Sequence, residues 1–142
     1  MANHAGVGCK VRQSSLGPDH WLFDFDGAAP GGGGGASVYL DPARAWASID
    51  GVHKNVLLPK RSTGRLLADG LAQVGMAQPA VVEAYNVERT TRVVLAAGGD
   101  GKGTVIGNML EDTVTALGGT VLRWVPVHDG NAFHLQVWIT YP

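Results

Sequence analysis

A run of five glycines follows Pro30, and it limits the fold of this chain more than any other stretch of the sequence. Glycine loses more backbone freedom on folding than any other residue, so a regular element that included residues 31–35 would carry a high entropic cost. Such a run is typical of a flexible linker. We therefore predict a linker over residues 30–35, a partly ordered amino-terminal segment over residues 1–29 and a globular domain over residues 36–142.

The size and composition of the chain exclude several classes of protein. Its 142 residues, 45% of them hydrophobic, fit one small domain with a core of its own. The longest apolar runs are far shorter than the roughly 18 residues of a membrane span, and no secretory signal peptide is visible, so no membrane contact is expected. One cysteine and five scattered histidines show no zinc-ligand spacing, so we expect neither a metal nor another cofactor.

Glycine, proline and capping residues divide the domain into short elements. The sequence predicts helices over residues 42–49, 63–74, 87–97 and 104–117, the third of them capped by Asn86. Residues 21–26 alternate apolar and polar side chains, which is typical of an edge strand. Residues 52–61 fit a strand or an extended loop, and residues 80–87 fit a strand or a helix. Most of the expected helices thus precede the last part of the chain.

The last part of the chain carries a hairpin signal. Asp129-Gly130 lies in a turn between two alternating segments, residues 120–127 and 132–141. On the final strand the apolar and polar side chains point to opposite faces, with the polar face made of His134, Gln136, Trp138 and Thr140. We therefore predict an α+β domain with helices packed on one face of a small antiparallel sheet that ends in a carboxy-terminal β-hairpin.

A basic cluster lies in the middle of the chain, where no acidic side chain occurs between Gly51 and Ala68. Its members are His53, Lys54, Lys60, Arg61 and Arg65. Cations in such a cluster can contact the phosphates of a nucleic acid and release its counterions. The alternative is a solvated loop followed by the start of a helix, because runs of charge usually face water. The net charge of −1 excludes broad electrostatic capture of nucleic acid and leaves room only for a local patch.

The polar face of the final strand is the second candidate site. Side chains two residues apart project in one direction, so His134, Gln136 and Trp138 would form a row that ends beside Tyr141. An imidazole can transfer a proton near neutral pH, and an indole can stack on an unpaired base. The alternative is an ordinary half-exposed strand whose Trp138 is covered by the amino-terminal segment.

The layout of residues 36–142, with its closing sequence Trp138-Ile139-Thr140-Tyr141-Pro142, resembles the carboxy-terminal toxin modules of bacterial polymorphic and contact-dependent toxins. Among them it is most similar to the metal-independent ribonucleases of the barnase, EndoU, colicin and RelE-type group. EndoU-like tails place a threonine two residues before the tyrosine, whereas this chain has Ile139 there. The resemblance implies an RNA substrate, a cognate immunity protein and a delivered effector that acts in the cytoplasm of a target cell.

The resemblance also implies roles for individual residues. His53 or His134 would be the general base and acid, and Lys60 or Arg61 the cation at the scissile phosphate. Tyr141 would contact a base or a phosphate. The remaining residues of both candidate sites would bind substrate: Lys54, Arg65, Gln136, Trp138 and Thr140.

A noncatalytic function is the alternative. An exposed hairpin can add to the sheet of a partner or of a second copy of the chain, so a homo-oligomer is compatible with the sequence. Trp124 and Trp138 would then anchor the interface, because tryptophan is enriched among the residues that carry binding energy.

Overall fold

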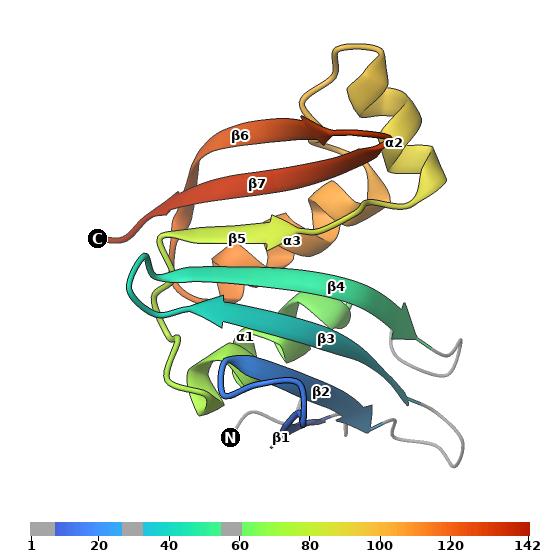
Figure 1. The fold of residues 1–142 in the computed structure, drawn as a ribbon. Coiled ribbons are helices and arrows are strands. Elements are labelled where there is room, and N and C mark those ends of the chain that lie inside the picture. The colour runs from blue at the N-terminus through green and yellow to red at the C-terminus, as the bar shows by residue number, and fades with distance from the viewer. Residues whose placement is uncertain (1–7, 27–32, 55–60) are drawn as a thin grey trace.

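The computed structural model of the chain describes residues 8–26, 33–54 and 61–142. Within these residues, seven strands form one sheet in the order β1–β2–β3–β4–β5–β7–β6 (Figure 1). The strands are β1 (Gly8–Gln13), β2 (His20–Asp26), β3 (Gly33–Asp41), β4 (Trp46–Lys54), β5 (Val81–Ala84), β6 (Thr120–Asp129) and β7 (Ala132–Thr140). The helices are α1 (Thr63–Gln73), α2 (Arg89–Ala96) and α3 (Val105–Ala116).

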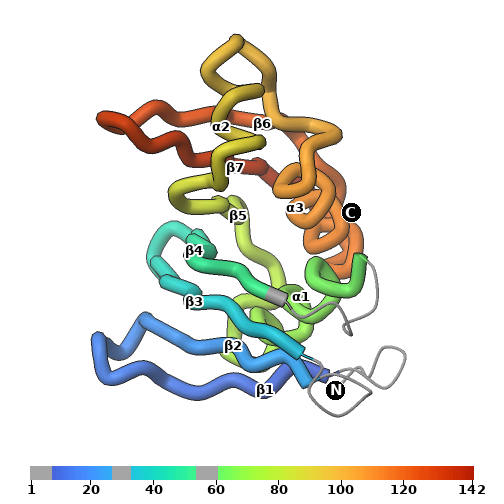
Figure 2. The backbone as a smooth tube through the Cα atoms, turned by 90° about the vertical axis from the view of Figure 1, so that its right-hand side faces the viewer, coloured from blue at the N-terminus to red at the C-terminus, as the bar shows by residue number. Residues whose placement is uncertain are grey.

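The core lies between the sheet and two helices. Helices α1 and α3 lie side by side against one face of the sheet, and no helix of the described residues covers the opposite face (Figures 1 and 2). Alternate strand residues such as Ile49, Val82 and Leu135 are buried against Leu67 of α1 and Leu110 of α3 in this core. The face without helices is therefore where polar strand residues are expected.

One strand pair differs from the others. Neighbouring strands are antiparallel except β4 and β5, which are parallel and are connected through α1. Their pairing covers only residues 46–49 of β4 and residues 81–84 of β5. Strand β5 then ends, while β4 continues to Lys54. The two strands consequently separate at their carboxyl ends.

The predicted fold class is confirmed. The domain is α+β, α1 and α3 pack on one face, and β6 and β7 form the carboxy-terminal hairpin. The expected second and fourth helices correspond to α1 and α3. The sheet is larger than expected and contains one parallel pair. None of the helices in the described ranges is long and apolar enough to cross a membrane.

The expected boundary at residue 36 is wrong. Residues 33–35 begin β3 and pair with β2, and residues 8–26 form two strands of the same sheet, so β2 is an interior strand. Phe23 of β2 is buried in the core. A Cβ atom on Gly35 would lie 2.7 Å from the carbonyl oxygen of Phe23 and 3.2 Å from Cε1 of His53. Glycine is therefore required here by close packing between strands, and the rest of the expected linker lies outside the described residues.

Two expected helix features are also wrong. Residues 42–45 form a turn in which the Asp41 carboxylate accepts hydrogen bonds from Arg44, and β4 follows in place of a helix. Helix α2 begins at Arg89, and its cap is Glu88. Asn86, the expected cap, adopts a φ of 55° between β5 and the helix. The ambiguous segment 80–87 contains the short strand β5.

Candidate functional site

Two adjoining cavities lie at the carboxyl ends of β4 and β5, and together they form what we call the β4–β5 cleft. The larger has a volume of about 440 Å³, the smaller about 170 Å³. Both are lined by Val52, Glu88, Ile106 and Met109. Ligands of open sheets bind outside the carboxyl ends of parallel strands, and pockets with an apolar lining and a few polar groups are the usual binding sites.

The cleft opens because β5 is short. Its last link to β4 is the hydrogen bond that the Tyr85 amide donates to the Ile49 carbonyl oxygen, at 2.8 Å. Beyond this point Asn86 turns the chain toward α2, while Gly51, with a φ of 66°, bends β4. On the helix side of the cleft, Gly64 of α1 lies close against α3. A Cβ atom on Gly64 would lie only 2.5 Å from the Cβ atom of Asp112, so the absence of a side chain lets the two helices approach.

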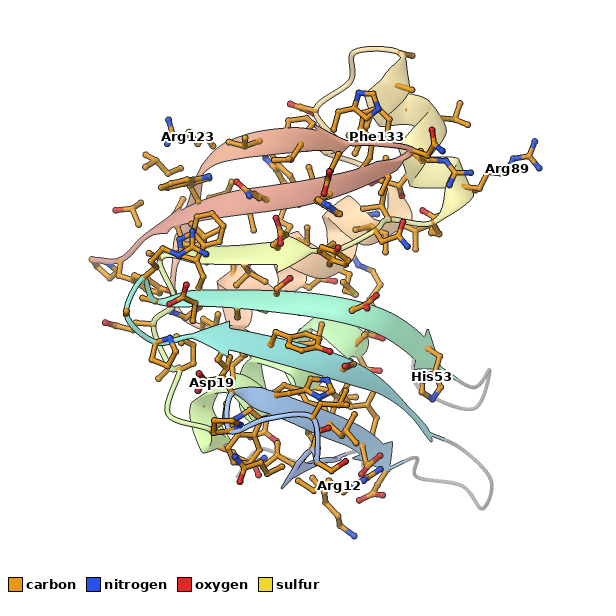
Figure 3. All side chains as sticks on the ribbon, in the orientation of Figure 1. Arg12, Asp19, His53, Arg89, Arg123 and Phe133 are labelled. Carbon is orange, nitrogen blue, oxygen red and sulfur yellow. The ribbon has the colours of Figure 1, made fainter. Side chains whose placement is uncertain are left out.

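His53 and Arg61, two residues of the expected basic cluster, both line the larger cavity. His53 is exposed near the end of β4 (Figure 3), where its ring packs over Gly35. Arg61 directly precedes Ser62, the N-cap residue of α1, and has a φ of 59°. A positive φ is uncommon for arginine, and backbone strain of this kind clusters at functional sites. Asn86, with a comparable φ, lines the smaller cavity.

An ion pair holds the Arg61 guanidinium at the wall of the cleft. Its Nε and Nη2 donate hydrogen bonds of 3.1 and 2.9 Å to the two oxygens of Asp112. These bonds raise the pKa of Arg61 above its ordinary value, so the group remains charged. A guanidinium has five N–H donors, so three are left for a ligand. Arg61 is exposed and Asp112 is half-buried, so the pair adds little to folding, and its main effect is to orient the guanidinium.

Glu88 adds a carboxylate to both cavities, and sequence reasoning missed it. Its oxygens accept hydrogen bonds from the amides of Thr90 and Thr91 at the start of α2. Burial raises the pKa of Glu88, but the bonds from Thr91 and Thr90 together outweigh it and lower the pKa below its ordinary value. The group is therefore ionised near neutral pH. The available signal was its position shortly after β5, the second strand of the parallel pair.

His134 and Gln136 are buried on the face of the sheet without helices. Nδ1 of His134 accepts a hydrogen bond from the Asn86 amide at 2.8 Å, and its Nε2 lies 3.6 Å from Oδ2 of Asp129. The Gln136 amide donates to Glu83 at 2.9 Å. Both side chains thus make contacts within the sheet, and neither lines the cleft.

The remaining residues of the expected polar row lie at the other end of the strands. Trp138 packs edge-on against Trp46, with ring centroids 5.9 Å apart, and the Arg123 guanidinium lies 4.4 Å above it. Trp46 is the first residue of β4 and His53 lies seven residues further along, about 23 Å away at about 3.3 Å per residue. The indole and the His53 imidazole are therefore separate.

Tyr141 and Thr140 follow Trp138 at the same end. The Tyr141 hydroxyl donates a hydrogen bond to the Pro79 carbonyl oxygen at 2.8 Å, and burial raises its pKa to about 12. Thr140 is exposed at the end of β7. The Tyr141 hydroxyl therefore joins the carboxy-terminal residues to the segment before β5.

The other basic residues are less well placed. Arg65 is exposed on α1 and lines a separate cavity of about 430 Å³ between α1 and α3. The backbone of Lys54 pairs with Gly34, while the Lys54 side chain and all of Lys60 lie outside the described part of the chain. Among the described residues, no group of three or more histidine, cysteine, aspartate or glutamate side chains could hold a metal ion.

No family model matches the sequence, and no curated protein matches it. We therefore interpret the β4–β5 cleft from its own geometry. It combines an imidazole from β4, a guanidinium from the start of α1 and an ionised carboxylate from the start of α2 over an apolar floor.

Proposed function

We propose that this chain cleaves single-stranded RNA by metal-independent general acid and base chemistry, with the phosphodiester held in the β4–β5 cleft. The observation that carries the proposal is that His53, Arg61 and Glu88 line one cavity of about 440 Å³. An imidazole, a guanidinium and an ionised carboxylate can serve as the acid, the phosphate ligand and the base of this reaction.

In the proposed reaction Glu88 removes the proton of a ribose 2′-hydroxyl, and the freed oxygen attacks the adjacent phosphorus. The bond from phosphorus to the 5′-oxygen breaks, and His53 donates a proton to that leaving oxygen. The products are a 2′,3′-cyclic phosphate and a 5′-hydroxyl. The free N–H groups of Arg61 stabilise the charge of the phosphorane, as oriented donors do in other acyl- and phosphoryl-transfer sites.

Several earlier expectations remain predictions that accompany this proposal. Lys60 stays a candidate for a second cation at the phosphate. RNA as substrate, an immunity protein as partner and action in a target-cell cytoplasm rest on the resemblance to toxin modules. His134 takes a supporting role in the proposal, because its Nδ1 already accepts a hydrogen bond from Asn86.

The test is cleavage of a short end-labelled single-stranded RNA by the purified full chain in the presence of EDTA. We expect fragments that end in 2′,3′-cyclic phosphate. His53→Ala should slow the reaction by about 100- to 10,000-fold, the usual effect of losing one proton-transfer group. Intact RNA with the wild-type chain, or equal cleavage by His53→Ala, would overturn the proposal.

A second candidate, assembly through the hairpin, is favoured by the free edge of β6. Leu122 of this edge strand has 64% of its surface exposed. The opposite edge strand, β1, instead has two ion pairs with β2, Lys10–Asp26 and Arg12–Asp24. Charged edges resist pairing with other chains, and apolar edges invite it. Light scattering after size exclusion should then show a dimer that Leu122→Lys converts to a monomer. A monomer at all concentrations would contradict this candidate.

A further inference from the structure

Tyr85 is an exposed aromatic ring at the edge of the cleft. It follows β5 directly, lines the smaller cavity and leaves 45% of its surface exposed. Its inner face stacks on His134, with ring centroids 4.2 Å apart and an angle of 14° between the planes. The ring is thus held on one side and free on the other.

The ring beneath Tyr85 is itself fixed. His134 is only 5% exposed, and its Nδ1 accepts the 2.8 Å hydrogen bond from the Asn86 amide. Because Nδ1 is the acceptor, the ring hydrogen lies on Nε2, which faces Asp129. Asn86, whose amide makes this bond, also lines the smaller cavity. The stack is therefore tied to the wall of the cleft and preorganised before any ligand binds.

A second stack in the same sheet offers a comparison. Tyr39 of β3 is also 45% exposed and also stacks on a buried histidine, His20, with centroids 4.0 Å apart and an angle of 17°. The ring of His20 contacts the Ser37 hydroxyl, whereas the ring of His134 accepts its hydrogen bond from the Asn86 amide. Tyr39 pairs with Ser48 in the middle of the sheet and lines neither cavity of the cleft. The two tyrosines have similar stacks and exposure, but only Tyr85 lines the cleft.

We infer that Tyr85 stacks on an unpaired base of the RNA whose phosphate lies at Arg61 and His53; this rests on the proposed function. Flat aromatic side chains bind unpaired bases by stacking and do so with every base, because each has a π-face. The smaller cavity, which Tyr85 lines, shares four lining residues with the larger one, so the two cavities adjoin, and a base at Tyr85 would neighbour the phosphate in the larger one. The substrate class is single-stranded RNA, since paired bases cannot present a free face.

The test measures binding apart from cleavage. A fluorescein-labelled single-stranded RNA is titrated with the full chain carrying His53→Ala, and fluorescence anisotropy reports the dissociation constant. Adding Tyr85→Leu should weaken binding about 10- to 100-fold, the usual effect of losing one stacked base. Tyr85→Phe should bind within about twofold of the parent, because it keeps the ring. Tyr39→Leu, the matched control, should also bind like the parent.

An abasic oligomer of the same length sharpens the result. Without bases, we expect the difference between the parent and Tyr85→Leu to disappear. Equal affinities of Tyr85→Leu and Tyr39→Leu for RNA would overturn the stacking role while leaving the proposed function in place. A parent chain that binds no RNA would overturn both. Near-ultraviolet circular dichroism of each variant shows that the fold is kept.

Discussion

The two ends of β4 differ in their surroundings: the amino end is paired with β5 and packed, whereas the carboxyl end is unpaired on that side and borders a cavity. At the amino end Trp46 and Trp138 lie on either side of Val81, which is fully buried although it is on the face without helices. At the carboxyl end β5 has stopped, and the cleft takes the place of a paired strand. Figure 3 shows Arg123 and His53 near these opposite ends.

The difference teaches that strand length, more than residue type, decides where this sheet leaves a cavity. Where β4, β5 and β7 remain paired, large side chains pack against one another. Trp138 is used in this way, with Trp46 at its edge and Arg123 on its face. Where pairing ends, 45% of the surface of Tyr85 is exposed, and polar groups from β4 and from the starts of α1 and α2 line the larger cavity.

Among the comparisons of the two ends of β4, the largest expected effect comes from replacing one arginine at each end with alanine. Arg61→Ala should lower kcat/KM for RNA cleavage by about 100-fold, because it removes oriented donors from the phosphate. Arg123→Ala, the matched control, removes an arginine that lies over Trp138 and should leave kcat/KM unchanged. Initial rates at subsaturating RNA measure both. Equal losses in the two variants would contradict a site at the carboxyl end alone.

The second prediction concerns stability at the amino end. Trp138→Ala should lower the free energy of unfolding by about 2 kcal/mol, less than for a fully buried tryptophan because the ring is half-buried. The cleavage rate of the folded variant should equal that of the wild type. Urea unfolding measures the stability, and rates are compared at a temperature where both chains are folded. Lost RNA binding with unchanged stability would place the ligand at the indole.

Much of the fold could be predicted from local signals. Asp129-Gly130 between alternating segments marks the hairpin, and glycines after residues 74, 97 and 117 mark the ends of the helices. The β3–β4 hairpin was missed because Asp41-Pro42 is also a good helix start. Apolar and polar side chains alternate over residues 47–50, and Ala47 and Ile49 are the buried ones. This alternation is typical of a strand and argues against a helix here.

The candidate site was less predictable, since it depends on tertiary structure. His53 and Arg61 are close in sequence and were expected together. Glu88 and Tyr85 reach the cleft only because β4 and β5 are parallel and β5 is short. We expected His53 to lie near the polar row of β7, but His53 and Trp138 lie at opposite ends of the strands. The pattern of charges along the sequence does not show which ends of two strands lie together.

The smallest expected effect is the pH dependence of the stability that Glu88 adds as the cap of α2, beside the cleft. The pKa of Glu88 is lower in the folded chain than in the unfolded chain, so its stabilising contribution is present above about pH 4.5 and is lost as the pH falls through the folded value. Glu88→Gln should be less stable than the wild type by about 0.5 kcal/mol at pH 7, because glutamine keeps an acceptor oxygen but lacks the negative charge at the start of the helix. This difference should vanish in urea unfolding at acidic pH. A difference that persisted there would exclude the ionised cap as its cause.

The most direct measurement maps a bound RNA on the two ends of β4. A 2′-O-methyl oligonucleotide cannot be cleaved by attack of a 2′-hydroxyl, and it is titrated into the nitrogen-15-labelled chain while amide and indole signals are followed by nuclear magnetic resonance. We predict the largest shifts at residues 51–53, 61–64 and 85–88, with the indole signals of Trp46 and Trp138 unmoved. Shifts centred on the two indoles, with the cleft amides unmoved, would contradict the assignment of the site.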